Sequence, residues 1–135
     1  MKDPANPTSD EIEEWARTPG AMYPMEDWDL IIADDENAVV FSRLAADPSC
    51  VNRGAILNFL YVYTGQVIRG GARANEVANL QMLIERANAA DLDDVRLWAK
   101  RATTALGGSG PSPRAGAGRE DYEFWFGRGW RKAID

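Results

Sequence analysis

The residues of this sequence best suited to chemistry are carboxylates spaced three residues apart. Asp10 and Glu13 form one such pair, and Asp91 and Asp94 form a second. On a helix, side chains at this spacing share one face, where two carboxylates can supply oxygen ligands to Mg²⁺ together with water. Asp10, Glu13, Asp91 and Asp94 therefore define one alternative function, a magnesium-dependent, nucleotide-directed hydrolase.

All-α nucleotide pyrophosphohydrolases hold such a metal between carboxylate pairs on two packed helices, but the full spacing pattern of that family is absent here. Both pairs also lie at the expected beginnings of helices. Acids are favoured there by capping and by the helix dipole, without any metal. We therefore expect no metal and no cofactor, and keep the hydrolase as an alternative.

The densest acidic stretch indicates a different chemistry, the recognition of a basic protein surface. It consists of Glu26, Asp27, Trp28, Asp29, Asp34, Asp35 and Glu36. Aromatic anchors surrounded by charge are common at the centres of interfaces. These seven residues are the predicted partner-binding site. A solvated face is the ordinary role of a charge run, and Trp28, like Trp15, fits a core more easily than an interface.

The charge of the whole chain supports the same interpretation. Residues 1–50 carry 12 acids and 3 bases, a net charge of −9, within a chain whose net charge is −6. Nucleic-acid binding needs clustered Lys and Arg, so a nucleic-acid partner is not expected. An acidic half steers a basic protein surface toward it at low salt, although the same charge also serves solubility.

Several residue types that support catalysis are missing. The sequence has no histidine, which excludes a Ser-His-Asp triad and a Cys-His pair, and it has one cysteine, Cys50, which excludes an internal disulfide. We expect Cys50 to be a buried thiol and Tyr61 and Tyr63 to be packing residues. The Gly-rich stretch 107–118 lacks the Gly-Lys-Ser/Thr ending of a phosphate-binding loop.

Apolar residues recurring at helical spacing predict an all-α fold, a compact irregular bundle of about six helices. The first follows a Thr8–Glu11 capping box and stops at Thr18, and the second starts near Glu26, with Trp28, Ile31 and Ile32 on one face. The third is capped by Asp34 or Asp35 and ends at Asp47. The last three cover residues 51–69, 75–89 and 92–106, the final one capped by Asp91 and forming a hairpin with its predecessor. A pair of HEAT-like hairpins is the alternative.

The segment 51–69 has two apolar stripes, which is typical of a central helix covered on both sides. Its Phe59–Tyr63 portion is also β-prone, so a strand is the alternative there. Length favours the helix, because the sequence has no second strand of similar quality.

The chain is expected to form one helical domain over residues 1–106, followed by a flexible linker over 107–118 and an aromatic tail over 119–135. The tail contains Tyr122, Phe124, Trp125, Phe126 and Trp130. Exposing that much apolar surface to water is unfavourable, so we expect the tail to dock on its own domain, or alternatively on a partner or second copy. Its deletion separates the cases: unfolding indicates docking on its own domain, and loss of an oligomer indicates docking on a copy.

In bulk properties the chain resembles immunity proteins, which are often small, acidic, helical and without catalytic groups. We therefore expect a non-enzymatic, protein-binding inhibitor that occupies the basic cleft of a bacterial toxin. An adaptor or oligomeric subunit assembled through the tail is a further alternative. The lone cysteine, the absence of a signal peptide or membrane span, and 12 Arg against 3 Lys predict a cytoplasmic bacterial protein.

Overall fold

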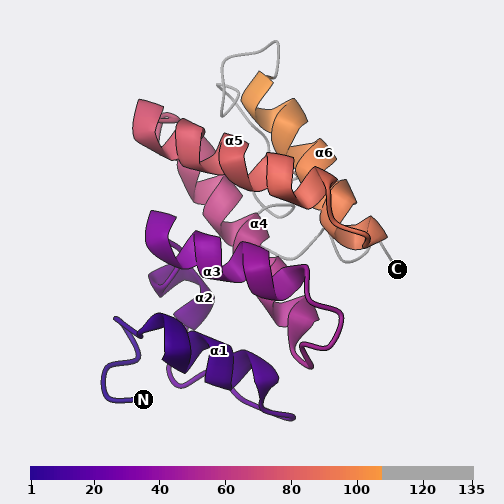
Figure 1. The fold of residues 1–135 in the computed structure, drawn as a ribbon. Helices are drawn as coiled ribbons and strands as arrows, with labels where there is room; N and C mark the ends of the chain where they lie inside the picture. The colour runs from indigo at the N-terminus through magenta and orange to yellow at the C-terminus, as the bar shows by residue number, and fades with distance from the viewer. Residues whose placement is uncertain (108–135) are drawn as a thin grey trace. The chain divides into compact units, whose positions relative to one another are not determined.

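The computed structural model describes residues 1–107, and every regular element in that part of the chain is an α-helix (Figure 1). The helices are α1 (Ser9–Arg17), α2 (Trp28–Ile31), α3 (Asp35–Ala45), α4 (Arg53–Arg69), α5 (Ala74–Asn88) and α6 (Asp93–Gly107). The all-α class and the six helices are thus confirmed. The tail and all but the first residue of the linker lie outside the described residues.

Contacts between residues group the chain into two compact units, residues 1–63 and a second unit that begins at Thr64. The first unit contains α1, α2, α3 and the first turns of α4. The second contains the last turns of α4 together with α5 and α6. The single domain expected over residues 1–106 stays a prediction.

In the first unit, α1 begins where the sequence predicts. Thr8 Oγ1 accepts a hydrogen bond from the Glu11 backbone N–H (3.2 Å), and Glu11 Oε1 accepts one from the Thr8 N–H (2.9 Å). This reciprocal capping box satisfies two N–H groups that the first turn of a helix leaves without partners. The helix buries Ile12, Trp15 and Ala16, and it packs against α3.

Helix α2 is shorter than predicted. Asp27 adopts a left-handed backbone conformation (φ 57°) immediately before Trp28, so no helix extends back to Glu26. Only one turn forms, and it buries Trp28 and Ile32 but leaves Ile31 41% exposed. The prediction that Ile31 shares the buried face was therefore wrong.

The core of the first unit is rich in aromatic rings. The rings of Trp15, Tyr23, Trp28 and Phe59 lie within 5.1 to 5.9 Å of one another, centroid to centroid. Phe41 of α3 adds an edge-on contact with Phe59 at 5.2 Å. This cluster joins side chains from all four helices of the unit, in tilted or edge-to-face geometries that suit aromatic pairs.

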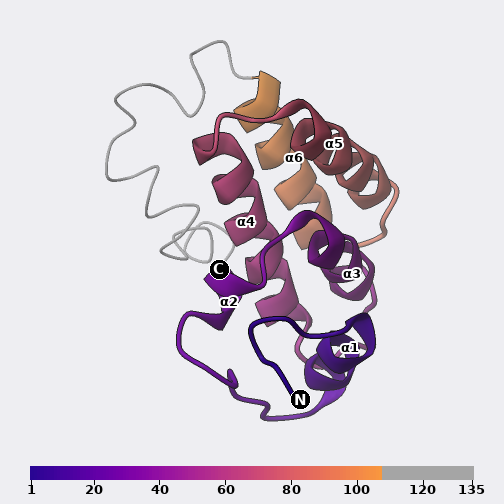
Figure 2. The same cartoon turned by 90° about the vertical axis from the view of Figure 1, so that its left-hand side faces the viewer.

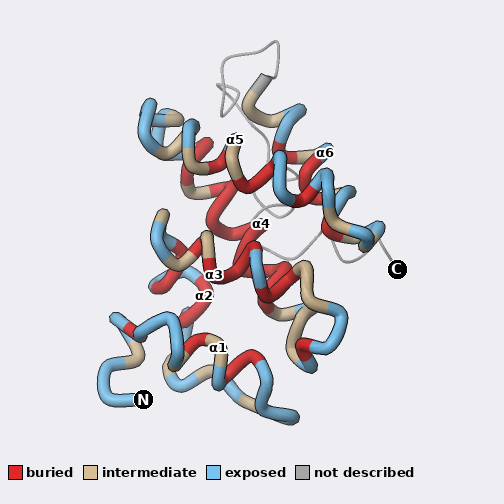
Figure 3. Tube along the Cα trace, in the orientation of Figure 1, coloured by how far each residue is buried: buried red, intermediate tan, exposed pale blue. Residues whose placement is uncertain are grey.

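Helix α4 is buried along most of its length, which Figure 3 shows as a long red stretch. Every residue from Ile56 to Tyr63 is at most 1% exposed, so both apolar stripes are covered, as predicted. The strand alternative for Phe59–Tyr63 was wrong, because this segment is the middle of a 17-residue helix.

In the second unit, α5 and α6 pack against each other as the predicted hairpin and lie side by side in Figure 2. Their buried positions are Leu80, Leu83, Ile84, Ala87, Val95, Trp98, Ala99 and Ala102. The prediction that Asp91 caps α6 was wrong. The Leu92 carbonyl accepts the first helical hydrogen bond, from the Arg96 N–H, so the helix begins at Asp93.

Candidate functional site

The acids of the predicted partner-binding site divide into exposed and structural residues. Glu26, Asp27 and Glu36 are exposed, and their carboxylates make no hydrogen bond or ion pair with any other described residue. Asp34 is also exposed, but it caps α3: its Oδ1 accepts a hydrogen bond from the Asn37 N–H at 2.8 Å. These four carboxylates can meet a partner without any change in the fold.

Trp28 was predicted as part of the binding site, and the structure places it in the core. Its side chain is 0% exposed, and its indole Nε1 donates a hydrogen bond to the Pro4 carbonyl at 2.6 Å. A ring that is fully buried and satisfied in this way cannot anchor a partner. The correct interpretation was the other one that the sequence offered, a core tryptophan.

Two of the predicted acids are held inside the first unit. Asp29 is only 9% exposed, and its carboxylate accepts hydrogen bonds from Asn58 Nδ2 (3.3 Å) and from the Leu30 N–H (3.0 Å). Asp35 accepts a hydrogen bond from the Tyr63 hydroxyl at 2.7 Å. Both carboxylates therefore have partners within the fold, so we do not count them among the acids that face a basic partner.

Sequence reasoning missed two apolar residues between these acids. Leu30 and Ile31 on α2 are 40% and 41% exposed. Their exposure follows from the single helical turn, because Trp28 and Ile32, four residues apart, take the buried face. We call the set Glu26, Asp27, Leu30, Ile31, Asp34 and Glu36 the acidic–apolar surface.

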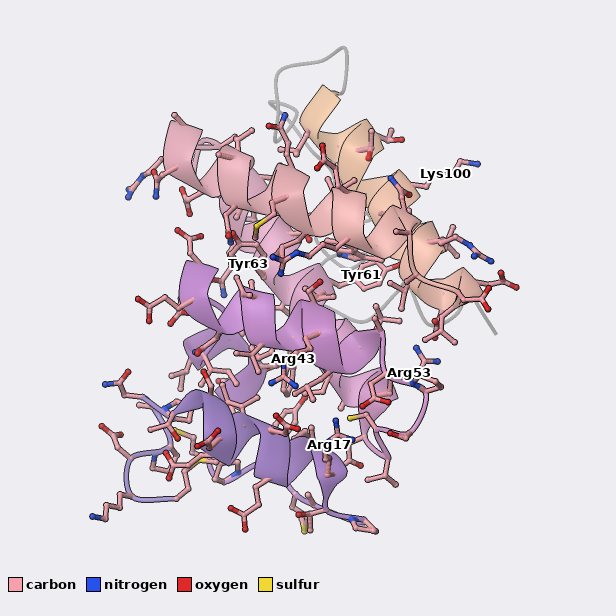
Figure 4. The ribbon with its side chains drawn as sticks, in the orientation of Figure 1. Arg17, Arg43, Arg53, Tyr61, Tyr63 and Lys100 are labelled. Atoms are coloured by element: carbon pink, nitrogen blue, oxygen red, sulfur yellow. The ribbon has the colours of Figure 1, made fainter. Side chains whose placement is uncertain are left out.

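The carboxylates of the hydrolase alternative lie in different surroundings. Glu13 is held between two arginines, with Arg43 at 2.8 Å and Arg17 at 3.0 Å, and Figure 4 shows both arginines between α1 and α3. Hydrogen bonds from Arg43 and Arg17 lower the pKa of Glu13. Arg17 also reaches Asp47 at 2.6 Å. The carboxylate of Glu13 is thus engaged in linking α1 to α3.

The other three residues of that alternative do not form a ligand cluster. Asp10 is exposed on α1, and Asp91 and Asp94 belong to the second unit, where Asp91 lies 3.8 Å from Arg96. Within residues 1–107, no three His, Cys, Asp or Glu side chains are grouped so as to hold a metal ion. The described geometry therefore gives the hydrolase alternative no support.

A small hollow on α1 was also missed by sequence reasoning. It has a volume of about 210 Å³ and is lined by Met1, Glu11, Glu14, Trp15, Thr18 and Ala21. The sequence signal was available, since Glu11, Glu14, Trp15 and Thr18 recur at helical spacing and lie on one side of the helix.

Cys50 and the two tyrosines have the packing roles predicted for them. The Cys50 thiol is 4% exposed and lies 3.4 Å from the Ala16 carbonyl, to which it donates. Burial raises the pKa of this thiol, which disfavours the thiolate that a nucleophile needs. Tyr61 and Tyr63 are buried on α4, where Figure 4 labels them.

Comparisons with known proteins give no match: neither a family model, nor a curated protein, nor a solved structure resembles this chain. In the part of the chain that the structure describes, no helix has both the length and the apolar character needed to cross a membrane. Inferences about function therefore rest on the residues and their geometry.

Proposed function

We propose that this protein is a non-enzymatic binding module that uses its acidic–apolar surface to occupy a basic site on a protein partner. The most concrete form of the proposal is an immunity-type inhibitor that neutralises a bacterial toxin by filling its basic cleft. A cytoplasmic, bacterial setting belongs to this proposal and comes from the residue composition and the single cysteine.

The observation that carries the proposal is the combination of charge and apolar area on one short segment. Glu26, Asp27, Asp34 and Glu36 are exposed acids, and Leu30 and Ile31 lie between them in the sequence with about 40% of their area open to water. Interfaces commonly combine a central apolar area with a polar rim. Acids in the rim raise the association rate with a basic partner, while the apolar pair contributes contact area.

Binding is also the chemistry that the remaining side chains favour. The only cysteine is a buried thiol with a raised pKa, and the chain has no histidine. Glu13, the best-placed acid of the hydrolase alternative, is engaged by two arginines. The adaptor alternative depends on the tail, which lies outside the described residues, so no observation favours it here.

The test is a capture experiment with two charge-matched variants. The first reverses two acids of the surface, Glu26→Lys with Glu36→Lys. The second makes the same charge change in the second unit, Glu85→Lys with Asp91→Lys. The tagged wild type and both variants are used to capture proteins from lysate at low and at high salt. Circular dichroism first establishes that both variants keep the helical content of the wild type.

We expect the wild type and the control variant to retain one basic protein at low salt, and the surface variant to lose it. With the purified partner, the surface variant should associate at least several-fold more slowly, and high salt should reduce this difference. The purified partner should also lose its own activity when the wild type binds. Equal retention by both variants would reject the surface, and a partner that stays active would reject the inhibitor form.

A further inference from the structure

The hollow on α1 has a lining in which negative charge is not fully balanced. Glu11 and Glu14 contribute two carboxylates, and the α-ammonium of Met1 lies 4.0 Å from Glu11 Oε2. Glu14 makes no side-chain hydrogen bond or ion pair with any described residue. Among residues 1–107, the lining therefore has one carboxylate without a counter-charge, that of Glu14.

Glu11, the other carboxylate of the hollow, already has hydrogen-bond donors of its own. Its two oxygens accept hydrogen bonds from the Thr8 N–H (2.9 Å) and the Lys2 N–H (3.3 Å). The hydrogen bond from Thr8, which is the main cause, lowers the pKa of Glu11. Its charge is thus already met by the ammonium and backbone donors, which leaves Glu14 to attract a further cation.

Trp15 gives the hollow an aromatic wall of fixed orientation. Its indole Nε1 donates a hydrogen bond to the Met22 carbonyl at 2.9 Å, and its ring packs on Trp28 and Phe59. The residue is 9% exposed, and it is one of the six residues that line the hollow. An aromatic ring attracts an organic cation most strongly when it does not have to be reoriented first.

We propose that this hollow binds a single organic cation, the guanidinium or ammonium group of an Arg or Lys side chain of the protein partner. Glu14 supplies the charge and Trp15 supplies the aromatic contact. That the cation belongs to a protein partner rests on the proposed function above. That the hollow binds an organic cation does not depend on it.

A divalent metal ion fits this lining less well. Mg²⁺ and Ca²⁺ take six or more oxygen ligands, and a site of this kind usually has several carboxylates close to the ion. Here Glu11 is already bound by backbone donors, and the indole offers no oxygen. The hydroxyl of Thr18 is engaged as a donor to the Glu14 carbonyl at 2.6 Å. The residues that line the hollow therefore suit an organic cation better than a divalent metal ion.

The first test uses the purified protein alone, with N-butylguanidinium as the probe and N-butylurea as its neutral isostere. The readout is the NMR resonance of the Trp15 indole N–H, assigned by comparison with Trp15→Phe. We expect a saturable shift with the cation and none with the urea. Glu14→Gln should weaken the binding at least several-fold, whereas the matched surface variant Glu85→Gln should leave it unchanged. A shift of equal size in Glu14→Gln, or with N-butylurea, would overturn the proposal.

The second test identifies the source of the cation and uses the captured partner. If the partner inserts a side chain, Glu14→Gln should retain several-fold less partner than Glu85→Gln does. N-butylguanidinium should also elute several-fold more partner than N-butylurea does. If the hollow binds the probe but neither change affects the partner, the side-chain source is wrong and the ligand is a free cation. Because the first test needs no partner, failure of the hollow is distinguishable from failure of the proposed function.

Discussion

The half-buried carboxylate of Asp47 makes the stability of the first unit depend on pH. Its carboxylate accepts hydrogen bonds from the Ser49 hydroxyl (2.7 Å) and N–H (2.9 Å), and it pairs with Arg17 at 2.6 Å. These interactions, with the Ser49 hydroxyl as the largest, lower the pKa of Asp47 from 3.8 to about 2. The folded state therefore binds this proton more weakly than the unfolded state does.

The lowered pKa of Asp47 predicts a specific pH dependence of stability. The stabilisation is complete above pH 3.8, the ordinary value, and is lost as the pH falls toward about 2. Asp47→Asn should therefore be less stable than the wild type at neutral pH, and the difference should shrink as the pH falls through this window. Urea denaturation at a series of pH values measures it. A difference that stays constant down to pH 2 would contradict the assignment.

Trp28 is the residue whose burial most changes the predicted site. Trp28→Ala should destabilise the protein by about 3–5 kcal/mol, because it removes a fully buried aromatic side chain and leaves a cavity. Trp28→Phe should cost less, roughly 1–3 kcal/mol, because it loses the donor to the Pro4 carbonyl but keeps a ring. Thermal or urea unfolding measures both. Unchanged stability in Trp28→Ala would contradict the core position and favour a partner-binding role for this residue.

The sequence predicted individual acids better than it predicted the surface they form. The cap of α3 was predicted to be Asp34 or Asp35, because N-cap chemistry depends on neighbouring residues alone, and the structure assigns it to Asp34. The apolar character of Trp28 already favoured a core position. The burial of Asp29 depends on Asn58, which is distant in the sequence, so no local pattern reveals it. Leu30 and Ile31 were missed for the same reason, since their exposure follows from which residues α2 buries.

At the scale of elements, the C-terminal end of α1 is held by the connection between α3 and α4. Asn52 Nδ2 donates hydrogen bonds to the carbonyls of Trp15 (3.0 Å) and Thr18 (2.8 Å), and the Asn52 N–H donates to the Ala16 carbonyl (2.9 Å). The last carbonyls of a helix have no partners within the helix itself. One residue thus satisfies three carbonyls at the end of α1.

Replacing Asn52 should therefore weaken the attachment of α1. Asn52→Ala should cost about 1–3 kcal/mol, because two carbonyls lose their side-chain donor. Asn52→Asp has nearly the same shape but should cost more, since it brings carboxylate oxygens against carbonyl oxygens. Asn88→Ala, at an exposed position of α5, is the control and should stay within about 0.5 kcal/mol of the wild type. Equal stability of the Ala and Asp variants, measured in urea, would contradict this role.

Helices with strong local signals were predicted well, and helices defined by tertiary contacts were not. The Thr8–Glu11 capping box located α1 to the residue, and the length of the apolar run identified α4 as a helix. The beginning of α2 was predicted near Glu26, whereas the left-handed backbone of Asp27 delays it to Trp28. A left-handed aspartate gives no pattern in the sequence, so this boundary depended on the structure.

For the molecule as a whole, α4 is the element that belongs to both units. The boundary between them falls after Tyr63, which leaves 11 residues of the helix in the first unit and 6 in the second. Isolated helices shorter than about 12–15 residues are marginal in water. Neither part of α4 is therefore expected to remain helical if the other unit unfolds.

This sharing predicts that the described part of the chain unfolds in one cooperative step. In native-state hydrogen exchange, buried amides on both sides of the boundary, such as those of Leu60 and Val67, should open with the same free energy. Their response to added urea should also have the same slope. Asn88, an exposed residue at the very end of α5, is expected to exchange its amide hydrogen faster and serves as a comparison. Two distinct opening energies along α4 would show instead that the units unfold separately.

The aromatic cluster also determines how the first unit absorbs light. The indoles of Trp15 and Trp28 lie 5.1 Å apart with their planes at 61°. Electronic transitions of two rings at this distance and angle couple, which produces a pair of circular dichroism bands of opposite sign in the ultraviolet. The sign and size of this couplet depend on the relative orientation of the two rings. The first unit therefore contains an intrinsic optical probe of its own packing, which disappears when either ring moves away and needs no added chromophore.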